Sequence, residues 1–112
     1  MKRIILSIAA LPIACSMTVF AAETAVPEVK AEVIVNERCA ACHGVDGNSV
    51  DANNPRLAGQ WRDYLAKALR DYKSGARNNG IMSGFAKGLS DKDIENLAAY
   101  YAAQKPVLNA KY

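Results

Sequence analysis

Histidine is nearly absent from this 112-residue chain, in which His43 is the only one. Aromatic residues make up 7%, and neither sign of charge dominates, because 14 Lys and Arg residues stand against 11 Asp and Glu residues. The longest apolar run, near the N-terminus, is broken by Pro12 and Ser16 and falls short of the roughly 20 residues that cross a bilayer. The length allows one globular domain and excludes two, while 51% hydrophobic residues exclude disorder throughout.

Residues 1–21 have the organisation of a secretory signal peptide. Lys2 and Arg3 precede the apolar run, and Val19 and Ala21 stand three and one residues before the expected cut. Cleavage there leaves 91 residues for the periplasm, with no membrane span. Since the leader removes two basic residues and no acidic one, 12 Lys and Arg remain against 11 Asp and Glu. That balance gives no electrostatic support for binding nucleic acid.

Cys15 offers an alternative reading of the leader. Lipid attachment to a cysteine after a short apolar run would tether the protein to a membrane. The four residues before it match a lipoprotein cleavage box only in part, because Pro12 stands where an aliphatic residue is expected. We expect Cys15 to leave with the signal peptide, so that Cys39 and Cys42 are the cysteines of the mature chain.

The pentapeptide C-A-A-C-H at residues 39–43 is the strongest signal in the sequence. A structural zinc site needs four ligands, and the mature chain has no further Cys or His. A thioredoxin-like redox pair would need a preceding strand and a βαβ context, and a free dithiol without a cofactor would be a liability in an exported protein. The two thiols can instead bond covalently to one haem while His43 becomes an axial ligand of its iron.

The rest of the mature chain predicts an all-α domain over residues 30–112, after a flexible lead-in at 22–29. Helical residues compete with the strand formers Val33, Ile34 and Val35 between residues 30 and 41, and we expect a helix there. Residues 44–59 are dense in Gly, Asn, Asp and Pro and predict a loop. A helix follows, with a stop at Gly75 and apolar residues at helical period: Trp61, Tyr64, Leu65, Ala68, Leu69 and Tyr72.

We expect a second loop at 76–89, with one helical turn around Phe85 and Ala86, and then a last helix. Ser90 and Asp93 form a capping box at its start. Its buried face carries Ile94, Leu97, Ala98, Tyr101 and Ala102, and Pro106 bounds it. About three main helices give a small domain a thin core. A covalent haem would complete that core, so we expect the apoprotein to be largely unfolded.

Met82 is the candidate ligand opposite His43. A second histidine is excluded by counting, and Met82 is the one methionine left after the signal peptide is removed. A lone methionine more often fills gaps in an apolar face, but the flanking N-N-G and S-G segments show no apolar helical period. With a haem present, ligation of the iron is the favoured role.

The chain resembles a small class I bacterial cytochrome c, and most of all a single-haem member of the cytochrome c-553/c4 group. The resemblance covers about residues 37–105 and rests on C-A-A-C-H-G at 39–44, P-R-L-A-G-Q at 55–60, Y-L at 64–65, K-S-G-A-R at 73–77, Met82, and L-S-D-K-D-I at 89–94. It departs from the two-haem c4 proteins because the sequence has one haem motif.

This resemblance implies a class I cytochrome fold around one covalent haem c. It implies thioether links from Cys39 and Cys42, axial ligation of iron by His43 and Met82, and a bond from the His43 ring to the Pro55 carbonyl. It also implies that Arg77 lies near the haem propionates. The pocket wall is implied to contain Leu57, Tyr64 and Leu65.

The expected function is that of a periplasmic one-electron carrier and not of an enzyme. With both axial positions taken, a substrate has no place on the iron, and partner proteins would meet the haem edge through small, transient interfaces; the carrier itself is expected to be a monomer. Two alternatives stay open. The chain could be a haem subunit of a larger oxidase or dehydrogenase, or a ligand-binding haem sensor in which Met82 is absent from the iron or easily displaced.

The leader analysis predicts the N-terminus of the mature protein. Because the cut is expected after Ala21, protein purified from a periplasmic fraction should begin at Ala22, as read from its intact mass. A membrane-bound form that begins at a lipid-modified Cys15 would contradict this prediction.

Overall fold

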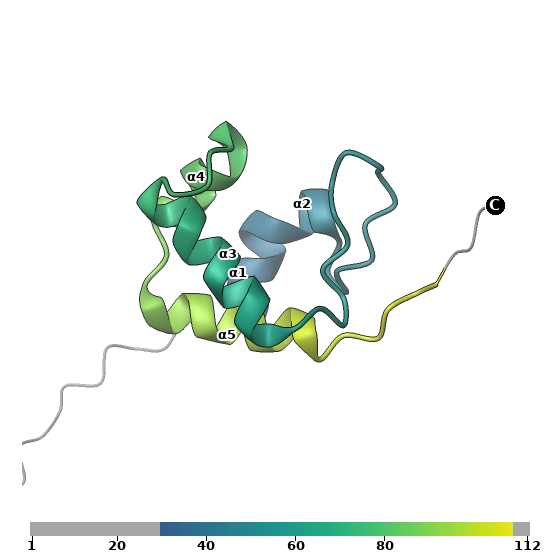
Figure 1. Cartoon of the computed structure of the whole chain (residues 1–112). Coiled ribbons are helices and arrows are strands. Elements are labelled where there is room, and N and C mark those ends of the chain that lie inside the picture. Colours follow the sequence, from purple (N-terminus) through teal and green to yellow (C-terminus); the bar gives the residue numbers. More distant parts are fainter. Residues whose placement is uncertain (1–29, 109–112) are drawn as a thin grey trace, which may run out of the picture.

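The computed structural model describes residues 30–108, and this part of the chain is helical with no strand (Figure 1). The predicted signal peptide, Cys15, the lead-in at 22–29 and residues 109–112 lie outside the described residues. The elements in chain order are α1 (Ala31–Ile34), η1 (Val35–Cys39), α2 (Ala40–His43), α3 (Arg62–Ser74), α4 (Gly80–Lys87) and α5 (Asp91–Ala102).

The N-terminal helical segment runs without a break through α1, η1 and α2. The prediction of a helix at 30–41 is confirmed, because Val33 and Ile34 belong to α1 in spite of their strand propensity. Ile34 and Val35 face the core, at 7% and 0% exposure. η1 is one turn of π-helix, a form that carries one more residue per turn than an α-helix and often lies beside functional residues. Gly44, at φ 81°, ends the segment.

Helices α3 and α5 form the centre of the domain, and both follow the sequence prediction closely. Gly75 ends α3 in the left-handed conformation, at φ 85°. Ser90 caps α5 by accepting from the Asp93 amide, and the Asp93 side chain accepts from the Ser90 amide in return. This reciprocal pair satisfies amide groups that a helix start leaves free. The predicted face of α5 is buried at Ile94, Leu97, Ala98 and Tyr101.

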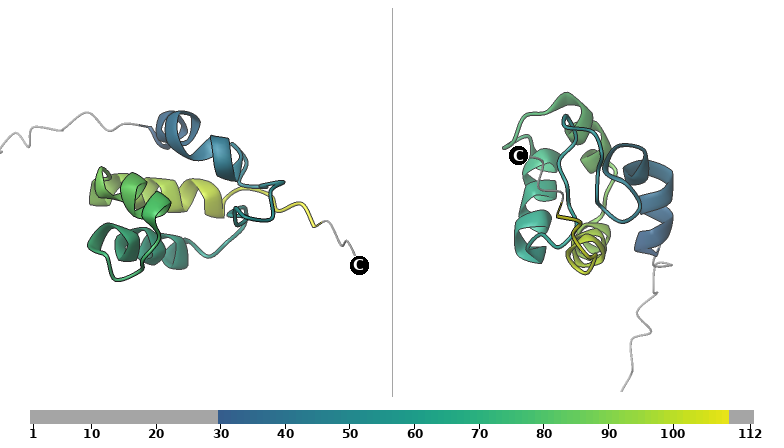
Figure 2. Two further views of the ribbon diagram at one scale, coloured as in Figure 1. Left: turned by 90° about the horizontal axis from the view of Figure 1, so that it is seen from above. Right: turned by 90° about the vertical axis from the view of Figure 1, so that its right-hand side faces the viewer.

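The arrangement of the helices places α5 between two groups. In the left view of Figure 2, α5 lies between the N-terminal segment on one side and α3 on the other. Both α1 and α3 contact α5, and α3 also contacts α4. The buried core cluster draws most of its side chains from the N-terminal segment, α3 and α5, among them Val35, Leu65 and Ile94. Outside the core, Glu95 of α5 forms ion pairs with Arg62 and Arg70 of α3.

The predicted helical turn around Phe85 and Ala86 is present, but the prediction of a loop over the rest of residues 76–89 is wrong, because α4 extends over eight of them. The Asn79 side chain accepts from the amides of Ile81 and Met82 and so caps the helix. Gly80 and Gly84 indicate a loop in a local reading, yet glycine is only moderately unfavourable inside a helix. The apolar face that anchors α4 is short, with Ala86 fully buried. Met82 therefore lies in the first turn of a helix and not in a loop.

Gly47 has no room for a side chain. Its φ is +72°, and a Cβ there would lie 2.8 Å from the Ala58 amide nitrogen and 2.8 Å from a ring carbon of Tyr101. Gly75 is a matched control, since its φ is +85° but nothing lies within 4 Å of a Cβ built there. Both substitutions carry the cost of the left-handed backbone, and only the first adds a collision with backbone.

Gly75→Ala should lower the free energy of unfolding by about 1 kcal/mol. Gly47→Ala should lower it by about 1 to 3 kcal/mol more, because the collision forces the packed loop to shift. Urea unfolding of the purified protein, followed by circular dichroism, measures both. Equal losses in the two variants would mean that the loop makes room for the methyl group.

Candidate functional site

Cys39, Cys42 and His43 lie on one turn of the N-terminal helical segment. Cys39 ends η1, and the other two belong to α2. Residues three and four apart on a helix share a face, so the spacing directs all three side chains toward the same side. Both thiols are free, with Cys39 half-buried and Cys42 exposed. The motif thus presents two unlinked thiols and one imidazole together.

The His43 imidazole is buried and held in one orientation. His43 is only 7% exposed. Its Nδ1 atom lies 2.8 Å from the carbonyl oxygen of Pro55. A carbonyl can only accept, so Nδ1 carries the proton and donates. The second ring nitrogen, Nε2, then keeps its lone pair, which is the form of histidine that ligates a metal. The expected contact between His43 and Pro55 is therefore present.

The environment of Cys39 does not favour a reactive thiolate. Burial raises the pKa of the Cys39 thiol, and a hydrogen bond with Tyr101 and the positive charge of Arg38 oppose that rise without cancelling it. Redox-active CxxC pairs depend on a lowered cysteine pKa. The segment before the motif is also helical and not a strand. Both observations weigh against a thioredoxin-like pair.

A multidentate metal site of the zinc type is not found in the described part of the chain. Among residues 30–108, no group of three or more His, Cys, Asp or Glu side chains is placed to hold a metal ion. Within the same residues, no helix has the length and apolar character needed to cross a membrane.

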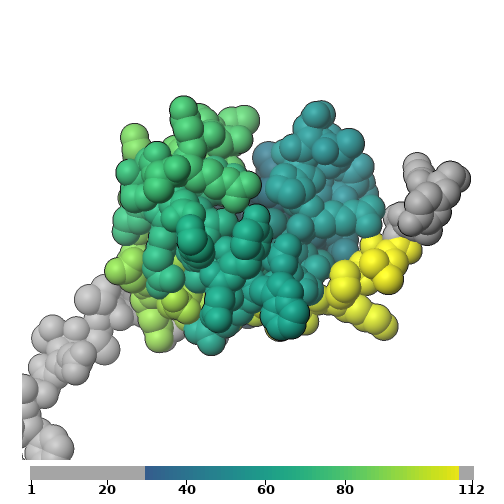
Figure 3. All heavy atoms as spheres, viewed as in Figure 1, coloured from purple at the N-terminus to yellow at the C-terminus, as the bar shows by residue number. Residues whose placement is uncertain are grey.

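Met82 lies on α4, across the molecule from the cysteine motif. It is half-buried, and its amide donates to the Asn79 side chain at 3.0 Å. In Figure 3 a notch separates the green side chains of the α4 region from the blue and teal side chains of residues 40–58. Figure 1 shows α2 and α4 at opposite sides of this opening. The two expected iron ligands are thus carried by elements that face the same notch.

The three residues expected in the pocket wall differ in burial. Leu65 is in the core at 7% exposure, and Leu57 is half-buried and packs against the same core. Tyr64 is 49% exposed. Two large apolar side chains of α4 are exposed as well, Ile81 at 68% and Phe85 at 43%. Three large side chains of α3 and α4 thus leave much of their apolar surface uncovered.

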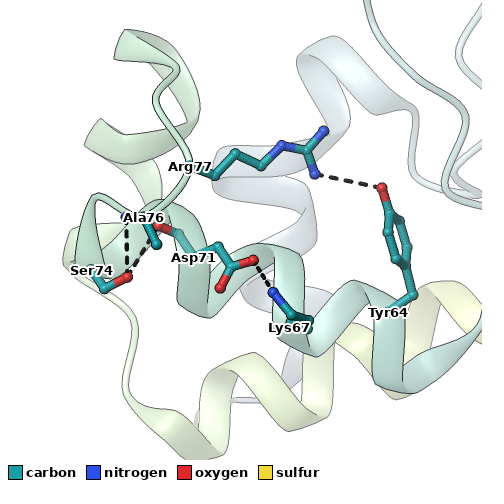
Figure 4. A network of polar contacts seen from close by, with 6 residues as sticks. All are labelled: Tyr64, Lys67, Asp71, Ser74, Ala76 and Arg77. Carbon is teal, nitrogen blue, oxygen red and sulfur yellow. Dashed lines mark hydrogen bonds and ion pairs between the residues drawn. The ribbon is translucent and has the colours of Figure 1, made fainter.

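Arg77 is held beside Tyr64 by two contacts. Its guanidinium donates to the Tyr64 hydroxyl at 3.5 Å (Figure 4) and lies 4.9 Å from the centroid of the Tyr72 ring. Figure 4 also shows the ion pair between Lys67 and Asp71 on the same helix. The contact with Tyr64 raises the pKa of Arg77. Because a guanidinium is always charged in proteins, a positive charge lies beside one of the expected pocket residues.

Sequence reasoning missed two hydroxyl groups that bond to the backbone directly after the motif. Tyr100 donates to the carbonyl of Val45 at 2.9 Å, and Tyr101 donates to the carbonyl of Gly44 at 3.3 Å. The helical period predicted burial of Tyr101. No local signal links either residue to a segment 55 or 57 positions away.

Comparisons with known proteins agree with one another. A family model described as Cytochrome c matches residues 29–104. A cytochrome c4 of Pseudomonas aeruginosa is 46% identical over 85 residues, which are 76% of this chain and 40% of the relative. The cytochrome subunit of sulfide dehydrogenase of Chlorobaculum tepidum is 38% identical over 68 residues, 61% of each chain.

A solved structure gives the same result. The crystal structure of reduced recombinant cytochrome c4 from Pseudomonas stutzeri matches with a TM-score of 0.61 at 42% identity, covering 70% of this chain and 45% of that one. The chain therefore spans less than half the length of the cytochrome c4 proteins that it matches.

The Asn79 cap gives a test of how α4 is held. Asn79→Ala should lower the free energy of unfolding by about 1 kcal/mol, because the amides of Ile81 and Met82 lose their acceptor. Asn79→Asp keeps an acceptor oxygen and should retain most of the stability. Asn78→Ala, one position earlier, is the control and should change stability by less than about 0.5 kcal/mol. Urea unfolding compares the three, and an equal loss for Asn78→Ala and Asn79→Ala would contradict the capping role.

Proposed function

Since the chain belongs to the cytochrome c family, as a class I c-type cytochrome of the c4 and c-55x group, we propose that it is a periplasmic one-electron carrier. Cys39 and Cys42 would hold a single haem c through covalent bonds, and His43 and Met82 would ligate its iron. The observation that carries this proposal is the hydrogen bond from His43 Nδ1 to Pro55, because it leaves Nε2 free to ligate.

The donor set fits a covalent haem. The two free thiols lie one helical turn apart, which suits bonds to two neighbouring vinyl groups, and the next residue is the buried imidazole. The exposed apolar surface of Tyr64, Ile81 and Phe85 lies on the elements that carry or adjoin Met82, where a flat apolar macrocycle would cover it. Burial of such surface contributes roughly 25 cal/mol per Å².

The expected pocket residues have separate roles in this proposal. Leu57 and Leu65 form apolar wall, and Tyr64 borders the opening. Arg77, fixed by Tyr64 and Tyr72, supplies positive charge for a propionate. Pro55 orients the His43 ring and raises its basicity through the hydrogen bond to Nδ1.

The haem iron supplies a one-electron couple when bound. The Met82 thioether is a soft, weak ligand, and a methionine ligand together with a dry pocket raises the reduction potential. Because His43 is the only histidine, no second imidazole is present for acid or base chemistry beside the iron. Transfer to and from partner proteins at an exposed haem edge is the activity that remains.

A second candidate is that the chain serves as the haem subunit of a larger dehydrogenase. It is favoured by the similarity to the cytochrome subunit of sulfide dehydrogenase. Size-exclusion chromatography of native periplasmic extract decides between the two. A haem-absorbing peak that elutes at the mass of the free chain supports the carrier. A haem-absorbing peak that persists at a larger mass supports the subunit.

The Met82 assignment predicts a spectroscopic change. The oxidised protein should show the weak far-red band of an iron–thioether bond, and Met82→Ala should lose it and gain binding of carbon monoxide in the reduced form. Lys87→Ala, at the exposed C-terminal end of the same helix, is the control and should keep the band. A c-type haem without the band in the unmodified protein would contradict ligation by Met82 and favour a ligand-binding haem protein.

A further inference from the structure

Two adjacent tyrosines near the end of α5 bond to the backbone directly after His43. The hydroxyl of Tyr101 donates to the carbonyl of Gly44 at 3.3 Å, and that of Tyr100 donates to the carbonyl of Val45 at 2.9 Å. Their rings meet edge to face, with centroids 5.3 Å apart and planes at 88°. Two consecutive peptide groups are thereby tied to the most central helix of the domain.

The same end of α5 also bonds to the last residue of the loop over residues 44–59. The Gly59 amide donates to the backbone carbonyl of Tyr101 at 3.0 Å, so Tyr101 contacts the loop at both its first and its last residue. Within the loop, the amide of Leu57 donates to Gly47 at 2.8 Å. Pro55, which accepts from His43, lies between these fixed points.

The residues after α5 extend this attachment. The Asn48 side chain donates to the carbonyl of Lys105 at 3.0 Å and accepts from the amide of Val107 at 2.8 Å. The Arg56 side chain donates to the carbonyl of Val107 at 2.7 Å. The C-terminal end of α5 and the residues after it therefore contact the backbone near both partners of the hydrogen bond, the His43 ring and the Pro55 carbonyl.

We propose that Tyr100 and Tyr101 are positioning residues for His43, acting through the carbonyls of Gly44 and Val45. They hold the peptide groups that follow His43, so that Nδ1 keeps its hydrogen bond to Pro55 and Nε2 keeps one direction. This role rests on the proposed ligation of a haem iron by His43. The strength of the Nδ1 hydrogen bond sets the basicity of the imidazole, so the two hydroxyls act on the reduction potential through the backbone. The Tyr101 hydroxyl also contacts the Cys39 thiol, whereas that of Tyr100 donates to Val45.

Tyr100 and Tyr101 differ in burial, so a positioning role can be tested apart from packing in the core. Tyr101 is 3% exposed and belongs to the core cluster, whereas Tyr100 is half-buried at its edge. Burial raises the pKa of Tyr101, so its hydroxyl stays a donor at neutral pH and above. Replacement by phenylalanine removes the hydroxyl of either residue and leaves the ring in place.

The test uses the haem-loaded protein and the variants Tyr100→Phe and Tyr101→Phe. Ser90→Ala is the control, because it also removes a hydroxyl hydrogen bond from α5 but lies at the opposite end of that helix. Proton NMR of the reduced protein measures exchange of the His43 Nδ1 proton with solvent, and redox titration measures the potential. Circular dichroism checks that the helices are intact.

Each of the two variants should exchange the Nδ1 proton about fivefold faster or more, which corresponds to the loss of one hydrogen bond of ordinary strength. The reduction potential should rise, because a weaker bond to Pro55 makes His43 a less basic ligand and favours the ferrous state. Ser90→Ala should lower stability by about 1 kcal/mol through loss of the helix cap and should leave both quantities unchanged. A purely structural role would lower stability without moving either the exchange rate relative to global unfolding or the potential.

Values equal to the control in both variants would overturn the positioning role. If Tyr101→Phe fails to retain haem, Tyr100→Phe decides alone, since its ring lies at the edge of the core. Absence of covalent haem from the unmodified protein, read from its mass, would instead overturn the proposed function. The two failures are therefore distinguishable.

Discussion

The hydrogen bond between His43 and the Pro55 carbonyl is the constraint around which the described structure is organised. It joins a buried ring at the end of α2 to a loop residue 12 positions later. Regular secondary structure does not continue at either end, because the helix stops at Gly44, whose φ is 81°, and Pro55 lies in a segment without regular secondary structure. Contacts from α5 hold the backbone on both sides of the bond.

Helix α5 supplies most of those contacts, and its own position depends on a small core. Its buried face meets α1 on one side and α3 on the other, and the Glu95 ion pairs to Arg62 and Arg70 contribute little because they are exposed. A domain of this size buries a low fraction of its surface. The proposed haem would add apolar contacts where Tyr64, Ile81 and Phe85 now face outward, and so would couple cofactor attachment to folding.

Local chemistry explains what the sequence could predict. The C-A-A-C-H motif, the apolar period of α3 and the Ser90–Asp93 capping box are all contained within a few neighbouring residues, and each of the two helices forms as predicted. The capping of α4 by Asn79 was equally local, but two glycines obscured it. The tyrosine hydroxyls could not be assigned from sequence, because their partners are 55 and 57 residues away and are backbone atoms, which leave no trace in side-chain patterns.

The π-helical turn η1 determines which side of the N-terminal segment carries the cysteine motif relative to its core-facing side. In an α-helix each residue turns the side-chain direction by about 100°, and a π-turn accommodates one residue more. Val35, fully buried, and Cys39, half-buried against the same core, stand at the two ends of this turn. Val35 and Cys39 can therefore both lie against the core, and the number of residues between them fixes the side of the segment on which the cysteine motif begins.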